Sequence, residues 1–89
     1  MVHVEFDPAK DAANVAKHGI SLVAAAEFDF TAAVITIDDR FDYGETRFRA
    51  FARVNGQDRC LVFTVTGQTT IRAISYRRAR QKEMQRHGL

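Results

Sequence analysis

The sequence has a single cysteine and no long hydrophobic run. Because Cys60 has no second thiol in the chain, an internal disulfide is excluded, and a reducing compartment, the cytoplasm, fits best. The longest apolar runs, such as Leu22–Ala26, are far shorter than the roughly 20 residues that cross a bilayer. We therefore expect a cytoplasmic protein without a signal peptide, a transmembrane span or a membrane partner.

Residues that hold metals and nucleotide cofactors are also scarce. The three histidines, His3, His18 and His87, show no metal-ligand spacing among themselves or with Cys60, so no structural zinc is expected. The few glycines form neither a phosphate-binding loop nor a dinucleotide fingerprint. The sequence thus predicts no metal and no cofactor.

Charge is distributed unevenly along the chain. Residues 1–45 contain three bases and nine acids, a net charge of −6, whereas residues 46–89 contain ten bases and two acids, a net charge of +8. Most of these bases are arginines, whose forked donors match phosphate oxygens in geometry. Such a distribution steers a nucleic acid toward one face and leaves the other face for a different partner.

The length and the hydrophobic patterning predict a single α+β domain over residues 1–89. A strand at Val2–Phe6 precedes a helix that starts at Asp7-Pro8 and stops at His18-Gly19, because aspartate caps helices, proline fits their first turn and glycine ends them. Later segments alternate with a period of two, as strands do. The further predicted elements are a second helix at Leu22–Phe28, strands at Val34–Asp38, Arg47–Val54, Cys60–Thr66 and Thr70–Tyr76, and a helix from about Arg78 to Arg86.

The predicted order, β-α-α-β-β-β-β-α, forms an antiparallel sheet with the helices packed on one face. Along the strand at 47–54, alternation places three arginines on one side and the core on the other. On the last strand, Arg72 shares its side with Ile74 and Tyr76. If the two basic faces coincide, which depends on strand register, the following residues line a concave basic surface near Arg77 and Arg78: Arg47, Arg49, Arg53 and Arg72.

Four motifs extend over nearly the whole chain: Phe6-Asp7-Pro8-Ala9-Lys10 with Asn14, Lys17-His18-Gly19-Ile20-Ser21, Gly44-Glu45-x-Arg47-Phe48, and Ile71-Arg72-Ala73-Ile74-Ser75-x-Arg77-Arg78-Ala79 with Glu83. In this order and at this spacing they resemble the BrnT toxins of bacterial type II toxin–antitoxin systems. The chain departs from the usual pattern at Phe6, where tryptophan is common, and at Tyr76, where alanine is common.

The resemblance implies a RelE-like fold and a ribonuclease that arrests translation. Cleavage of RNA without a metal needs a base for the 2′-hydroxyl proton, an acid for the leaving oxygen and cations for the pentavalent phosphorane. We expect Arg77 and Arg78 to be catalytic, as the cations of the transition state. Arg47, Arg53 and Arg72 are the expected substrate-binding residues.

The general base is harder to assign. Glu45 lies in one of the motifs and is the candidate, although a neighbouring arginine makes a carboxylate a poorer base and favours a role in orienting that arginine. Tyr76 is expected either to contact the substrate, by stacking on a base or donating a proton, or to belong to the core. His18 is interpreted first as part of a helix stop signal, with catalysis as the alternative. Glu83 is a further candidate base, or it pairs within its helix with Arg80 or Arg86, three residues away.

The resemblance also implies a partner, a BrnA antitoxin with a ribbon-helix-helix part, so that operator DNA is bound only through the antitoxin. The loop Asp38–Gly44 joins acids to two aromatic residues, a composition found at partner-binding surfaces and also in ordinary solvated loops. The alternative function is a non-catalytic nucleic-acid-binding or co-repressor module with the same fold. Turnover of RNA would separate the two functions.

Overall fold

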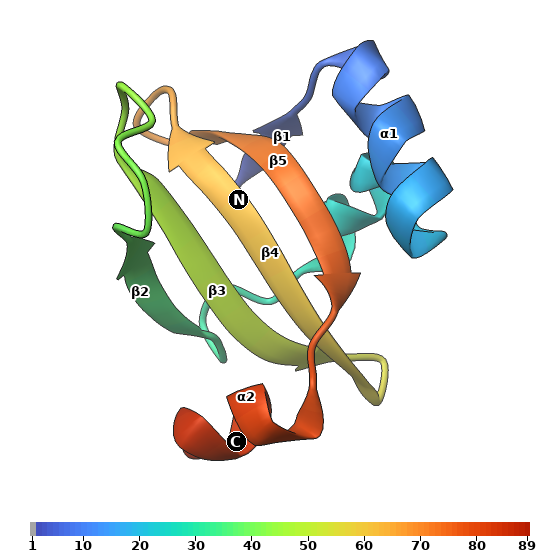
Figure 1. Cartoon of the computed structure of the whole chain (residues 1–89), viewed down its shortest axis with the longest axis vertical. Coiled ribbons are helices and arrows are strands. Elements are labelled where there is room, and N and C mark those ends of the chain that lie inside the picture. Colours follow the sequence, from blue (N-terminus) through green and yellow to red (C-terminus); the bar gives the residue numbers. More distant parts are fainter. Residues whose placement is uncertain (1) are drawn as a thin grey trace.

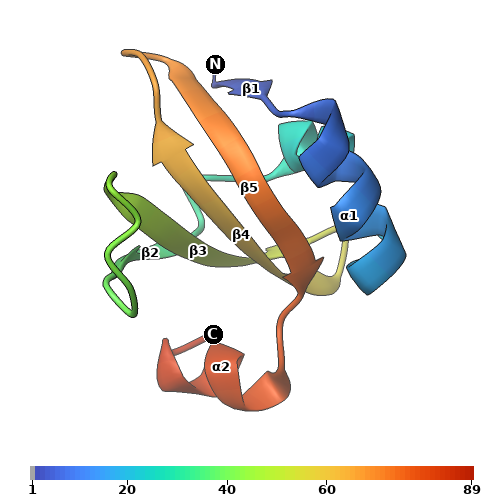
Figure 2. The same ribbon diagram turned by 45° about the horizontal axis from the view of Figure 1, so that its top comes forward.

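The computed structural model describes residues 2–89, which form a five-stranded sheet with three helical segments (Figures 1 and 2). The elements in chain order are β1 (His3–Glu5), α1 (Pro8–His18), the 3₁₀ helix η1 (Leu22–Glu27), β2 (Val34–Asp38), β3 (Arg47–Val54), β4 (Gln57–Val65), β5 (Thr70–Arg78) and α2 (Gln81–Arg86). The predicted α+β class is confirmed. The second predicted helix is a 3₁₀ helix, and the last strand continues past Tyr76, so that the final helix starts at Gln81 instead of Arg78.

The strands lie in the order β1-β5-β4-β3-β2. Strands β2 to β5 form an antiparallel meander, and Asn55-Gly56 turns the chain between β3 and β4 with both residues at positive φ. The prediction of a wholly antiparallel sheet is wrong for β1, which pairs in parallel with β5 through Val4 and Ile71. Alternation of side chains is the same for both strand directions, so the sequence pattern could not distinguish them.

The helices cover both faces of the sheet, not one face as predicted. Leu22 of η1 packs in one core with Ala50 of β3. Met84 of α2 packs in a second core with Phe51, the next residue of the same strand. Because neighbouring side chains of a strand point to opposite faces, η1 and α2 lie on opposite sides. We refer to these sides as the η1 face and the α2 face.

Helix α1 takes the place of a strand along part of β5. β1 pairs only with Thr70–Arg72, and beyond it α1 runs beside β5 (Figures 1 and 2). The buried Asn14 side chain donates to the carbonyls of Tyr76 (2.8 Å) and Ile20 (2.7 Å) and accepts from the Tyr76 N–H (3.1 Å). Asn14 thus satisfies backbone groups that a neighbouring strand would otherwise bind, and it fixes the end of α1 against β5.

Replacing Asn14 with alanine is expected to lower the free energy of unfolding by about 2–4 kcal/mol, because it leaves the buried N–H and carbonyl of Tyr76 without partners. Urea unfolding would measure the loss. Lys10→Ala, at an exposed position of the same helix, is the control and should change stability little. Equal stability of the Asn14→Ala variant and the wild type would contradict this role.

A bulge in β5 reverses the alternation of its side chains. The pairing of β5 with β4 shifts at Ile74, where β5 has one residue more. Before the bulge, Ala73 points into the η1 core and Arg72 to the α2 face; after it, Tyr76 points into the η1 core and Arg77 to the α2 face. The prediction that Arg72 and Tyr76 share a side is therefore wrong. The arginines that share the α2 face are Arg47, Arg49, Arg53, Arg72 and Arg77.

Candidate active site

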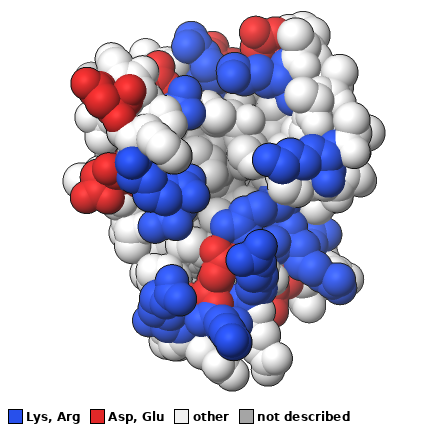
Figure 3. Space-filling model, viewed as in Figure 1, with Lys and Arg blue, Asp and Glu red and all other residues white. Residues whose placement is uncertain are grey.

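A cavity opens on the α2 face where the end of α1, the loop after β2, and strands β3 and β5 meet. It has a volume of about 240 Å³ and adjoins a second cavity of about 450 Å³ that extends toward α2. Both are lined by Lys17, His18, Arg40 and Arg77; the first is also lined by Asp38, Tyr43, Arg47, Val62, Ile74 and Ser75, and the second by Arg49, Arg78, Arg80 and Glu83. We call the two together the cationic cavity. Figure 3 shows lysine and arginine side chains gathered over the middle and lower part of this face.

His18 is the last residue of α1, and its side chain lines the cavity. The helix ends there as predicted, because Gly19 adopts the left-handed conformation (φ 72°) and donates its N–H to the Val15 carbonyl (2.8 Å). Partial burial, followed by the charges of Lys17 and Arg77, lowers the pKa of His18 below its ordinary value. The imidazole is therefore mostly neutral at neutral pH and able to accept a proton.

Arg40 is held in the cavity by Asp38, at the end of β2. Two hydrogen bonds of 2.8 Å join the guanidinium to both carboxylate oxygens, and Tyr43 donates its hydroxyl to the same carboxylate at 3.3 Å. The Asp38 side chain is 1% exposed, and its bond with Arg40 lowers the pKa of the carboxyl to about 2. This buried carboxylate stays charged and ties the loop after β2 to the cavity wall.

Arg47 lies on the same wall and is only partly exposed. Its guanidinium carbon sits 4.0 Å from the centre of the Tyr43 ring, a cation–π contact. Glu45 accepts a hydrogen bond of 3.4 Å from the Nε of Arg47. Glu45 itself is exposed and does not line the cavity, so its contact fits the orienting role rather than that of a general base.

Arg77 is bound by Glu83 across the gap between β5 and α2. Two hydrogen bonds of 2.8 Å join the guanidinium to both carboxylate oxygens, and Arg77 lowers the pKa of Glu83 to about 2. The predicted pairing of Glu83 with an arginine of its own helix is wrong, because its side-chain partner is Arg77 of β5. Glu83 also accepts a hydrogen bond from the backbone N–H of Arg80 (2.9 Å), which satisfies a free donor at the start of α2.

Arg49 lines the cavity and has no carboxylate partner among residues 2–89. It is partly buried, and among residues 2–89 its Nε has no hydrogen-bond partner although the atom is shielded from solvent. Arg78 and Arg80, which line the same part of the cavity, have no carboxylate partner in the described chain either. These three side chains are available to an anion without breaking an ion pair.

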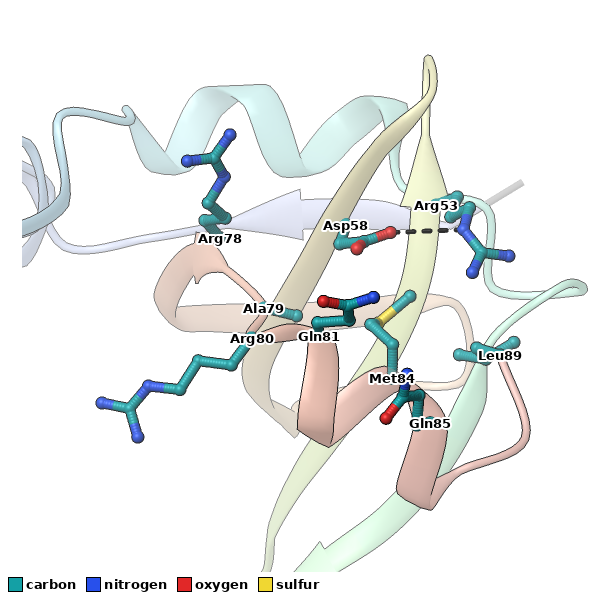
Figure 4. A pocket seen from close by; sticks show the side chains of 9 residues that line it. All are labelled: Arg53, Asp58, Arg78, Ala79, Arg80, Gln81, Met84, Gln85 and Leu89. Carbon is teal, nitrogen blue, oxygen red and sulfur yellow. Dashed lines mark ion pairs between the residues drawn. The ribbon is translucent and has the colours of Figure 1, made fainter.

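Two of the predicted substrate-binding arginines lie outside the cationic cavity. Arg53 pairs with Asp58 (3.2 Å) in a separate pocket of about 500 Å³ under α2, whose lining also includes Arg78 (Figure 4). Arg72 pairs with Glu5 (3.5 Å) near the β1 edge. The two basic faces, whose coincidence the sequence left open, do coincide, but their arginines form separate groups of charge.

Tyr76 lies in the η1 core and is 1% exposed, with its ring edge-to-face against Phe28. Its ring is not accessible to a substrate, so the substrate-binding prediction is wrong and the core alternative is confirmed. Burial raises the pKa of Tyr76. Cys60 is also buried, and burial raises the pKa of its thiol to about 11, so it is not a nucleophile at neutral pH.

In the part of the chain that the structure describes, no group of three or more His, Cys, Asp or Glu side chains is arranged to hold a metal ion. Within residues 2–89, no helix is long and apolar enough to span a bilayer.

Lys17, Arg40 and Tyr43 were not predicted as cavity residues from the sequence, and His18 was interpreted first as part of a helix stop signal. The pattern Asp38-x-Arg40 was a usable signal, because an arginine two residues from a strand-ending aspartate can fold back onto it. No local signal places His18 beside Ser75 and Arg77, since that contact depends on how Asn14 docks α1.

Comparison with known proteins agrees with the motifs. The family model of the ribonuclease toxin BrnT of type II toxin–antitoxin systems matches residues 6–83. Among solved structures, the crystal structure of the Brucella abortus ribonuclease toxin BrnT is similar, with 25% sequence identity and a TM-score of 0.69 over 91% of this chain and 100% of that chain. No curated protein matches the chain.

Proposed function

The chain belongs to the BrnT family of ribonuclease toxins of type II toxin–antitoxin systems, and we propose that it is a metal-independent endoribonuclease that cleaves RNA in the cationic cavity and thereby inhibits translation. The observation that carries the proposal is the convergence of one partly buried histidine with many cations in one cavity. These cations are Lys17, Arg40, Arg47, Arg49, Arg77, Arg78 and Arg80.

The proposed reaction is an in-line transfer within the RNA. The 2′-oxygen of one nucleotide attacks the adjacent phosphorus, a new 2′-O–P bond forms, and the P–O bond to the 5′-oxygen of the next nucleotide breaks. The 2′-hydroxyl proton goes to a base, and the leaving 5′-oxygen takes up a proton. The products are a 2′,3′-cyclic phosphate and a 5′-hydroxyl, so neither water nor a metal is consumed in this step.

His18 is the proposed general base, because its lowered pKa leaves the imidazole neutral at neutral pH and it faces the cavity. Lys17, the preceding residue, lines the same cavity and is the proposed proton donor to the leaving oxygen. In this proposal His18 replaces Glu45 as the base, while Glu45 orients Arg47. Histidine suits the task because the ordinary pKa of its side chain lies close to neutral pH.

The arginines are proposed to stabilise the phosphorane and to bind flanking phosphates. Arg77 and Arg40 are held in place by Glu83 and Asp38 and keep further N–H donors that their carboxylates do not use. Donors that are already oriented toward a developing charge need little rearrangement during the reaction. Arg49, Arg78 and Arg80 are proposed to bind the neighbouring phosphates of the strand.

The partner in this proposal is an antitoxin with a ribbon-helix-helix part, which would cover the cationic cavity and carry the toxin to operator DNA. The RelE-like classification of the fold and a cytoplasmic location belong to the same proposal. The order of the helices and the meander β2–β5 support the former, and the single buried thiol, Cys60, is compatible with the latter.

Induced expression in a bacterial host tests the proposal. Growth arrest with fragmented RNA is expected for the wild type and not for a soluble, folded His18→Ala variant. Intact RNA with normal growth on expression of soluble wild-type protein would favour the non-catalytic binding module instead. Arrest with intact RNA would contradict cleavage as the cause of toxicity.

RNA binding is expected to weaken steeply with salt, because each neutralised phosphate of a single strand contributes about −0.7 to the slope of log K against log[salt]. Arg49→Gln should make this slope shallower by about 0.7, since Arg49 lines the cavity and its Nε has no hydrogen-bond partner among residues 2–89. Arg72→Gln is the matched control, on the same face but paired with Glu5 outside the cavity. Fluorescence anisotropy of a labelled RNA at several salt concentrations measures both. Equal slopes for the wild type and Arg49→Gln would remove Arg49 from the phosphate site.

A further inference from the structure

Strand β2 is an unpaired edge of the sheet. It pairs only with β3, and within residues 2–89 no other strand lies along its outer side (Figure 1). Its sequence, Val34-Ile-Thr-Ile-Asp38, has no proline or lysine, the residues that commonly protect an edge from pairing with another chain. The row of backbone donors and acceptors on β2 is therefore open to an added strand.

Apolar side chains flank this edge. Ile37 is 62% exposed, and Ile35 is nearly half exposed on the same side of β2. Both extend the η1 core, because their β3 partners, Phe48 and Ala50, belong to it. Phe41, on the loop after β2, is 70% exposed. Three large hydrophobic residues exposed within one short segment mark an interaction surface rather than scattered exposure.

The surroundings of this edge are acidic. Residues 34–45, which form β2 and the loop after it, contain four acids and one base, a net charge of −3, and the single base, Arg40, is bound by Asp38. Exposed carboxylates follow the strand at Asp39 and Asp42. In Figure 3, acidic side chains gather at the left margin, the side on which Figure 1 places β2 and the loop that follows it. A segment that binds here must carry positive charge.

The negative charge near β2 also favours a different protein over a second copy of the chain as the occupant of this edge. If two β2 strands paired antiparallel about a two-fold axis, each copy would bring its β2 and the loop after it, with Asp39 and Asp42, to the same interface. Two segments that each carry a net charge of −3 would then be brought together. Like-charged surfaces repel each other, which disfavours a second copy relative to a basic segment.

We propose that the β2 edge binds an extended segment of a partner protein in which apolar residues alternate with lysine or arginine. The segment adds a sixth strand beside β2, its apolar residues cover Ile35 and Ile37, and its cations face the flanking carboxylates. Because Asp38 both ends β2 and lines the cationic cavity, the bound segment lies beside the cavity mouth. The inference deepens the partner side of the proposed function, but it does not require RNA cleavage.

Titration of the full chain with a synthetic peptide of about ten residues that alternates valine and lysine tests the proposal. Backbone amide shifts and slowed hydrogen exchange are expected at Val34–Asp38. Ile37→Lys should weaken binding by about ten-fold, because it removes buried apolar area and adds a like charge. Val23→Lys, at a residue of η1 that is also 62% exposed, adds the same charge elsewhere and should leave the affinity unchanged.

Two further peptides separate the contributions. A peptide with N-methyl groups on alternate amides keeps its side chains but cannot pair with the edge, and a valine–glutamate peptide keeps the strand pattern but reverses the charge. Both should bind at least ten-fold more weakly than the parent peptide. A ten-fold change in affinity corresponds to the free energy of about one lost hydrogen bond or charge contact. Equal binding of all three peptides, amide changes confined to other strands, or concentration-dependent dimerisation through β2 in place of peptide binding would overturn the proposal. RNA cleavage is measured in a separate assay, so failure of this proposal and failure of the proposed function can be told apart.

Discussion

Replacing His18 with glutamine is expected to lower the rate of RNA cleavage by about 10²- to 10⁴-fold, the range that a positioned general base contributes. Glutamine keeps a polar side chain of similar reach but cannot accept the 2′-hydroxyl proton. Because His18 ends α1 and is only partly buried, the variant should fold normally. Single-turnover cleavage of a labelled RNA, with circular dichroism as the check on folding, measures the effect.

The pH profile distinguishes a base from a merely structural histidine. A general base must be unprotonated, so the rate of the wild type should rise with pH through the pKa of His18 and then level off. That pKa is lowered by partial burial and by Lys17 and Arg77, so the rise should lie at lower pH than for an ordinary imidazole. The His18→Gln variant should lose this rise.

His87→Gln is the matched control for His18, because His87 stacks on Phe51 at 4.4 Å in the α2 core and does not line the cationic cavity. Its cleavage rate and pH profile should match those of the wild type. Full activity of His18→Gln, or a wild-type rate that falls as the pH rises toward neutral, would exclude His18 as the base.

The second large effect is expected at Arg77. Replacing it with glutamine should lower the cleavage rate by about 10²- to 10³-fold, the size observed when one oriented donor is removed from a developing negative charge. The same change leaves Glu83, a mostly buried carboxylate, without its bidentate partner. Stability should therefore fall as well, and activity alone does not show that Arg77 acts on the phosphate.

Glu83→Gln separates the two roles, because it breaks the ion pair and keeps Arg77. If Arg77 stabilises the phosphorane, Glu83→Gln should retain cleavage within about ten-fold of the wild type while Arg77→Gln does not. Equal losses of activity in the two variants would assign Arg77 a structural role. Urea unfolding of both variants shows how much of each loss comes from the fold.

The ion pair also gives stability a definite dependence on acid. The pKa of Glu83 falls from an ordinary value of 4.5 to about 2 on folding, so the unfolded chain binds the proton more readily. The contribution of the pair is therefore complete above pH 4.5 and is lost as the pH falls toward 2. Arg77→Gln should remove this part of the acid sensitivity, which unfolding curves at neutral pH and at about pH 3 would reveal.

Local signals in the sequence were sufficient for most of the elements. Asp7-Pro8 and Gly19 mark the two ends of α1 as predicted, and Asn55-Gly56 forms the turn between β3 and β4. The arginine face of β3 was also predictable, because alternation along a regular strand depends only on the strand itself. Arg77 and Arg47 were predicted as site residues, and the structure places both in the cationic cavity.

The remaining features depend on contacts between distant segments. The bulge at Ile74 turns Tyr76 into the core, and nothing in the alternation of β5 reveals it. The placement of His18 depends on three hydrogen bonds made by Asn14, and the partner of Glu83 depends on how α2 docks against β5. Strand register and helix docking are properties of the packed chain, which a local pattern does not encode.

The chemistry of the product ends shows whether the cationic cavity cleaves RNA without a metal. Purified protein is incubated with end-labelled RNA in the presence of a chelator, and the fragments are analysed for their termini. We expect cleavage by the wild type with 2′,3′-cyclic phosphate and 5′-hydroxyl ends, and none by His18→Gln. Fragments with 3′-hydroxyl ends, cleavage that requires an added divalent metal, or RNA that is bound at saturation and stays intact would contradict it.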